Sequence, residues 1–155
     1  MKRFLVVALA VLTTVAMTAS AEGAKKKPPL KIAANGWYIF DYGPDGKVGK
    51  TPKNGTYTRC VNDPNTPPVQ ELGGRYLIKN RTAPLGMKQI LNGPQKIHFS
   101  HPTGQKRPPG AYAHRFAASS IGRSSLPPGK YTFRVKIGKT TKMTETIKLV
   151  DNPNC

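Results

Sequence analysis

The 155-residue chain carries 25 lysines and arginines against 7 acidic residues, which gives a formal net charge of +18. The length is that of one ordinary domain, so a second domain is not expected. A charge of this size attracts anionic polymers and surfaces, so acidic partners are favoured from the outset.

Residues 1–21 have the three parts of a secretory signal peptide. Lys2 and Arg3 precede an apolar run over residues 4–17, and small residues at 19–21 supply a cleavage site. A membrane-spanning helix needs about 20 apolar residues, so permanent anchoring is the less favoured interpretation. We therefore predict an exported protein, periplasmic or secreted, which keeps 23 basic and 7 acidic residues after cleavage, a net charge of +16.

The mature chain is expected to begin with a flexible basic arm, residues 22–29, in which three lysines precede two prolines and no apolar period is present. Such an arm can tether the protein to acidic surfaces, or it can be a solvated leader that keeps the export junction accessible. Residues 30–155 are expected to form a single domain.

Export places the two cysteines in an oxidising compartment, where pairing is favoured over free thiols. Cys60 and Cys155 are the only cysteines, so we predict a disulfide between them. The alternatives are two unpaired thiols or a bond to another chain. Closing a loop of about 95 residues would restrict the unfolded chain by about 4 to 5 kcal/mol in the chain-entropy model.

From Leu30 onward, short runs of β-branched and aromatic residues are separated by Gly, Pro and Asn, and no amphipathic helical period is present. This pattern predicts an all-β domain. The expected strands are 32–42, 55–61, 75–79, 87–91, 95–100, 111–118, 130–137 and 141–150. Residues 62–68 are expected to form a loop, and residues 103–110 an exposed basic loop.

The last two expected strands have the clearest pattern. Tyr131, Phe133 and Val135 alternate with polar and basic residues, which predicts a strand with one buried face. A turn at Gly138-Lys139 then leads into the final strand, so a hairpin is expected, although Glu145 interrupts its apolar face. Neighbouring like charges on the outward face cost energy unless an anion or hydration relieves them.

Candidate contact residues for an anionic ligand are therefore basic side chains of the exposed loop and of the hairpin. They are Lys106, Arg107, Arg134, Lys136, Lys142 and Lys148. For any single one of them, a solvating charge is the simpler interpretation.

The same hairpin carries a resemblance. Residues 126–137 and 144–150 resemble the final two strands of exported bacterial immunoglobulin-like sandwiches, and residues 85–87, Gly93 and His101-Pro102 are similar to landmarks of an uncharacterised exported family of that kind. The resemblance implies an immunoglobulin-like antiparallel β-sandwich in the cell envelope, and it transfers no catalytic residue. The immunoglobulin cysteine pattern is absent, because Cys155 lies beyond the last strand.

Metal binding is the main alternative function. His98, His101 and His114 lie in neighbouring expected strands, and exported sandwiches can hold copper through histidine and methionine, which suit that ion. The His-x-x-His spacing, however, places His98 and His101 on opposite faces of a continuous strand. Met87 and Met143 are more simply core residues.

No catalytic set can be assembled from the sequence. Asp41 and Asp45 flank a Gly-Pro turn, where aspartate commonly serves turn geometry, and no Gly-x-Ser-x-Gly segment presents a nucleophile. We expect no enzyme activity and no cofactor.

The charge also guarantees some salt-dependent binding to nucleic acid in vitro, but export makes a specific nucleic-acid partner an unfavoured interpretation. We predict a non-enzymatic envelope binding or interaction module. Its expected partners are anionic envelope polymers or an envelope protein that docks on a sheet edge, and peripheral contact with a membrane surface is compatible with the same charge.

Overall fold

The structure is a computed structural model that describes residues 27–40, 55–61 and 68–154. The predicted signal peptide, most of the predicted arm and nearly all of the predicted loop at 62–68 lie outside these ranges, as do Asp41 and Asp45. Within the described part of the chain, no helix has the length and hydropathy of a transmembrane span.

The described residues form eight strands and one 3-10 turn, and the all-β prediction is confirmed. The elements are β1 (Lys31–Phe40), β2 (Thr56–Cys60), β3 (Glu71–Lys79), β4 (Lys88–Asn92), β5 (His98–Pro102), β6 (Gly110–Ala117), η1 (Ala118–Ile121), β7 (Gly129–Ile137) and β8 (Thr140–Asn152).

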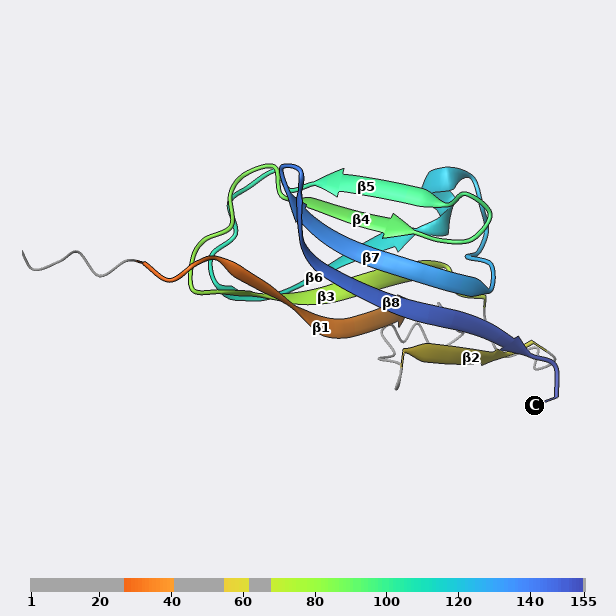
Figure 1. Cartoon of the computed structure of the whole chain (residues 1–155). Coiled ribbons are helices and arrows are strands. Elements are labelled where there is room, and N and C mark those ends of the chain that lie inside the picture. Colours follow the sequence, from red (N-terminus) through yellow and green to blue (C-terminus); the bar gives the residue numbers. More distant parts are fainter. Residues whose placement is uncertain (1–26, 41–54, 62–67, 155) are drawn as a thin grey trace, which may run out of the picture.

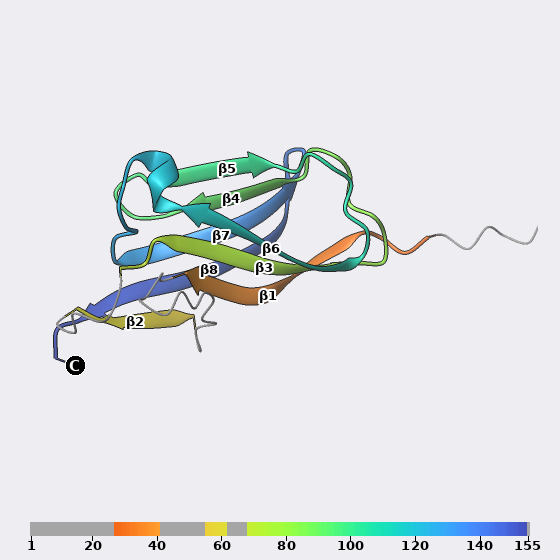
Figure 2. The same ribbon diagram turned by 180° about the vertical axis from the view of Figure 1, so that it is seen from behind.

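These strands form two sheets that lie face to face (Figure 1). A three-stranded sheet has the order β1-β3-β6, and a five-stranded sheet has the order β2-β8-β7-β4-β5. Figure 2 shows the smaller sheet in front of the larger one. Strand β2 pairs with β8 in parallel, whereas every other strand pair in the two sheets is antiparallel.

The aromatic core centres on Phe133 of β7, which is fully buried. Its ring contacts one aromatic side chain from each strand of the opposite sheet: Trp37 of β1 at 6.1 Å between centroids, Tyr76 of β3 at 6.2 Å and Phe116 of β6 at 6.4 Å. A buried aromatic side chain removes a large apolar area from water, so this cluster supplies much of the attraction between the sheets.

Strand β3 begins at Glu71, four residues before the expected start. The sequence pattern misses this first part because it contains two glycines, which have low strand propensity. At Gly74 the missing side chain is required: a Cβ there would collide with the Phe133 ring. The glycine therefore lets Phe133 reach the middle of the opposite sheet.

Strand β5 also differs from its expected range. It begins at His98 rather than at residue 95, because Gln95 and Lys96 have φ values of 52° and 61° and lie in a turn. Ile97 closes that turn through backbone hydrogen bonds with Pro94 and Gly93. Side chains alternate along β5, so Phe99 is buried and His98 is exposed.

The predicted hairpin of β7 and β8 is confirmed, with Gly138 and Lys139 forming the two-residue turn. Tyr131, Phe133 and Val135 are all buried, as the alternation predicts. Glu145 does face inward, and burial raises the pKa of its carboxyl against the lowering effect of a backbone hydrogen bond from Gly36.

A buried polar network fixes the segment that follows β5. The amide of Gln89 donates to the Tyr76 hydroxyl and to Thr103 Oγ1, both at 2.9 Å, and the Thr103 hydroxyl donates to the carbonyl of Met87 at 2.8 Å. Thr103 is 3% exposed, so the first residue of the predicted exposed loop at 103–110 is a buried anchor instead.

Strand β2 covers the outer edge of β8. Arg59 donates two hydrogen bonds to the carboxylate of Asp151, at 2.9 and 2.8 Å, and Cys60 is in register with Asn152. Cys155 and the side chain of Cys60 lie outside the described residues, so the disulfide stays a prediction. The register brings the main chain of Cys60 beside a residue that precedes Cys155 by three positions.

The role of Gly74 can be tested by substitution. We expect Gly74→Ala to lower the free energy of unfolding by about 1 to 3 kcal/mol, the usual cost of overpacking a core. The matched control is Gly104→Ala, because a Cβ at Gly104 meets no atom within 4 Å. Urea denaturation of both variants measures the effect, and equal stabilities would contradict the proposed fit of Gly74 to Phe133.

Candidate functional site

The outer face of the five-stranded sheet gathers basic side chains from three adjacent strands. We call this set the basic face, and its members are Lys88 of β4, Lys130, Arg134 and Lys136 of β7, and Lys148 of β8. All are exposed except Lys136, which is partly exposed. They face outward because their strand neighbours Tyr131, Phe133, Val135, Ile147 and Leu149 are buried between the sheets.

The register places like charges directly opposite each other. Lys88 is paired with Lys136, and Lys130 is paired with Lys148. Cβ atoms of such cross-strand pairs are about 4.5 to 5.5 Å apart, where like charges are destabilising. Arg134 lies between these two pairs along β7, with Ile90 and Thr144 as its neighbours.

No carboxylate of the described residues lies on this outer face. Glu71 belongs to the three-stranded sheet, where its carboxylate is 3.4 Å from Arg115. Glu145 faces inward, and Asp151 is held in its bidentate pair with Arg59. The positive charges of the basic face therefore have no acidic counterpart beside them in the part of the chain that is described.

Three of the six predicted contact residues, Arg134, Lys136 and Lys148, belong to the basic face. Lys142 is exposed and lies at a β-bulge, because Val135 pairs with Met143 whereas Lys136 pairs with Thr141. Lys88 and Lys130 were not among the predicted residues. The alternation of the hairpin strand already placed Lys130 outward, but the pairing of Lys88 with Lys136 needs a register that the sequence does not give.

The two predicted loop residues differ in their surroundings. Lys106 is exposed. Arg107 is partly buried: its backbone pairs with Ala83 in both directions, and its guanidinium lies 4.7 Å from the centre of the Tyr112 ring. The Nε atom of Arg107 is buried without a hydrogen-bond partner in the described structure. Arg107 is thus a packed residue rather than a freely solvated loop cation.

The three candidate metal ligands do not converge. His98 Nδ1 lies 2.6 Å from Asn92 Oδ1, on the outer face of β5. His101 and His114 instead meet across the gap between the two sheets, with ring centroids 4.7 Å apart. Among the described residues, no group of three or more His, Cys, Asp or Glu side chains could hold a metal ion. Met87 and Met143 are both buried in the core.

The histidine pair belongs to a wider contact between β5 and β6, which are edge strands of different sheets. Phe99 and Phe116 stack at 5.2 Å, and His114 contacts Phe116 edge-on at 4.6 Å. Beside these rings lies a half-open cavity of about 360 Å³, which we call the seam pocket. Burial, followed by the positive charges of His101 and Arg107, lowers the pKa of His114 to about 4.

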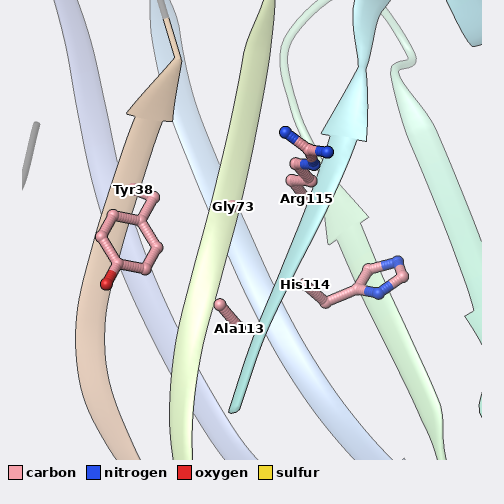
Figure 3. Close-up of a pocket in the computed structure, with 5 residues that line it drawn as sticks. All are labelled: Tyr38, Gly73, Ala113, His114 and Arg115. Carbon is pink, nitrogen blue, oxygen red and sulfur yellow. The ribbon is translucent and has the colours of Figure 1, made fainter. Parts of the chain in front are cut away.

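A second, smaller cavity of about 210 Å³ lies on the outer face of the three-stranded sheet. Figure 3 shows Tyr38 and Arg115 on opposite sides of Gly73, with the imidazole of His114 pointing away from Tyr38. The guanidinium of Arg75 lies 4.4 Å from the centre of the Tyr38 ring. Two small residues, Gly73 and Ala113, line this cavity together with Tyr38, His114 and Arg115.

No protein-family model matches this chain, and no curated protein matches it. The candidate functions consequently depend on the residues and geometry of the chain itself.

The lowered pKa of His114 predicts acid sensitivity. The unfolded chain binds the proton more tightly than the folded one, so the stability that neutral His114 contributes is present above pH 6.5 and is lost as the pH falls towards about 4. We expect the loss to be about 1 to 2 kcal/mol, after allowance for solvent screening of a partly exposed group.

The measurement compares the free energy of unfolding from pH 7.5 to 4 in the wild type, His114→Gln and His98→Gln. The first variant should flatten the acid limb, whereas the exposed His98 serves as the matched control. Parallel curves for all three proteins would contradict the assignment to His114.

Proposed function

We propose that this protein is an exported, non-enzymatic binding module whose basic face contacts an anionic envelope polymer. The observation that carries the proposal is the cluster of five cationic side chains on three adjacent strands, with no described carboxylate on the same face. Residues 1–21, with their basic start, apolar run and small residues, support export to the periplasm or beyond.

The dimensions of the basic face favour a polymer over a small ion. From Lys130 to Lys136 is about 20 Å along β7 at the usual strand rise, and β4 to β8 is about 10 Å across two strand spacings. Each exposed ion pair contributes only about 0 to 1 kcal/mol, so useful affinity requires several contacts at once. A chain of repeated negative charges meets that requirement, and it offsets the repulsion within the two lysine pairs.

For the fold, we infer an immunoglobulin-like antiparallel sandwich. The two facing sheets and the C-terminal hairpin support this inference, together with the resemblance of residues 126–137 and 144–150. The parallel pairing of β2 with β8 is an addition to an otherwise antiparallel arrangement.

Two other functions are less well supported. A protein partner could add a strand to the outer edge of β5 or β6, and such binding would depend little on salt. A copper site would have to be built on two stacked imidazoles, His101 and His114, since His98 lies on the other face of β5.

The proposal is tested with a charge-matched pair of double variants. Lys130→Gln with Lys148→Gln removes one lysine pair from the basic face, whereas Lys31→Gln with Lys79→Gln removes an exposed lysine pair from the three-stranded sheet. Both change the net charge by the same amount. We expect the first variant alone to bind heparin about tenfold more weakly at low salt, because two exposed ion pairs are lost.

The salt dependence gives a second readout. Each lost contact should reduce the slope of log affinity against log salt concentration by somewhat less than one, as for other polyanions. Equal losses in the two double variants would mean that net charge alone drives binding, and would overturn the assignment to the basic face. Recovery of the native protein from the cytosol with residues 1–21 intact would overturn the export part of the proposal.

A further inference from the structure

The outer face of the five-stranded sheet is not uniformly charged, because a row of neutral polar residues crosses the basic face. Asn92 of β4 is in register with Thr132 of β7, and Thr132 is in register with Thr146 of β8. The three strands lie side by side in the sheet (Figure 1). We call these three residues the neutral row. Each of them points outward, because the residue before or after it is buried between the sheets.

Positive charge lies on both sides of the neutral row. Two positions before Thr132 along β7 is Lys130, which pairs with Lys148, and two positions after it is Arg134. Two residues of a strand span about 7 Å. The face therefore presents a cationic, a neutral and again a cationic position in succession, each about 7 Å from the next at the main chain.

The groups of the neutral row suit sugar hydroxyls better than further anionic groups. Thr146 is exposed and Thr132 is partly exposed, and a threonine hydroxyl both donates and accepts hydrogen bonds. The Oδ1 atom of Asn92 lies 2.6 Å from His98 Nδ1, so Asn92 offers its NH2 group to a ligand. An ionised phosphate or carboxylate can only accept hydrogen bonds, whereas a sugar hydroxyl can use both functions of a threonine.

One apolar side chain lies among these polar groups. Ile90 points outward between Lys88 and Asn92 on β4, beside Arg134 of β7, and it is partly exposed. The C–H groups of a sugar ring can cover this side chain and remove apolar area from water. A polyphosphate chain has no C–H groups with which to do so, so Ile90 favours a ligand that carries rings as well as charge.

We propose that the basic face binds an acidic polysaccharide in which charged sugars alternate with neutral sugars. This inference rests on the proposed function and narrows it to one class of polymer. The anionic groups lie beside the Lys130 and Lys148 pair and beside Arg134, and a neutral sugar lies on the neutral row. A polyphosphate or a nucleic-acid strand has a negative charge on every unit, and it would also place charges over the neutral row, whose own members carry none.

The test compares two polymers, with binding to the full mature protein measured by isothermal titration calorimetry. Hyaluronan alternates a carboxylate sugar with a neutral sugar, whereas long-chain polyphosphate carries a charge on every unit. We expect the double variant Thr132→Val with Thr146→Val to bind hyaluronan about tenfold more weakly, the effect of losing two neutral hydrogen bonds. Its binding to polyphosphate should equal that of the wild type, and its salt slope for hyaluronan should not change, because no ion pair is lost.

Two further double variants control for the substitution itself. Thr82→Val with Thr140→Val makes the same change at two exposed threonines outside the neutral row, and it should bind hyaluronan as the wild type does. Thr132→Ser with Thr146→Ser keeps both hydroxyls, so it should restore binding. Valine and threonine both favour strands, and urea denaturation checks that each variant is folded.

The outcomes separate this inference from the proposed function. If the valine variant of the neutral row binds hyaluronan as the wild type does, loses both polymers equally, or weakens no more than the Thr82 and Thr140 control, the inference is wrong. It is also wrong if the wild type binds polyphosphate and heparin but not hyaluronan, and in that case the basic face remains a site for densely charged polymers. If none of the three polymers binds at low salt, the proposed function fails as well.

Discussion

The packing of one ring, Phe133, against three strands of the opposite sheet determines how this protein presents its charge. Trp37, Tyr76 and Phe116 surround that ring, and Gly74 leaves the space that it needs. Because side chains alternate along a strand, burying Phe133 and its neighbours Tyr131 and Val135 forces Lys130 and Arg134 outward. The basic face is therefore a consequence of the core: a change in register that removed it would also expose the largest apolar residues of β7.

The sequence predicts the parts of this arrangement that depend on local pattern. The hairpin, the buried face of β7 and the outward direction of Arg134 all follow from strict alternation. The expected strand at 87–91 forms as β4, but local pattern does not give its orientation, because Gln89 is buried and Ile90 is partly exposed. That orientation is explained by the hydrogen bonds of Gln89 to Tyr76 and Thr103, partners that only the tertiary structure brings together. For the same reason the sequence pattern does not identify Lys88 as a member of the basic face, since that depends on its pairing with Lys136.

Contacts between the sheets are the second part that sequence could not provide. His101 and His114 lie on strands of different sheets, so no spacing rule relates them, and the three-histidine hypothesis grouped them with His98 only because all three are near one another in sequence. The same applies to Arg107, for which a loop of Gly, Pro and basic residues predicts solvent exposure. Its pairing with Ala83 and its contact with Tyr112 depend on how two loops meet.

The short strand β5 bears on the polymer binding that we propose for the basic face. Crowding on such a template brings copies close together, and an open strand edge then invites one copy to join the next by backbone pairing. Strand β5 is only five residues long, it follows a turn with two left-handed residues, and it ends at Pro102, which has no amide hydrogen to offer. Its short length and its terminal proline disfavour such edge-to-edge pairing, so copies on the proposed polymer would stay separate.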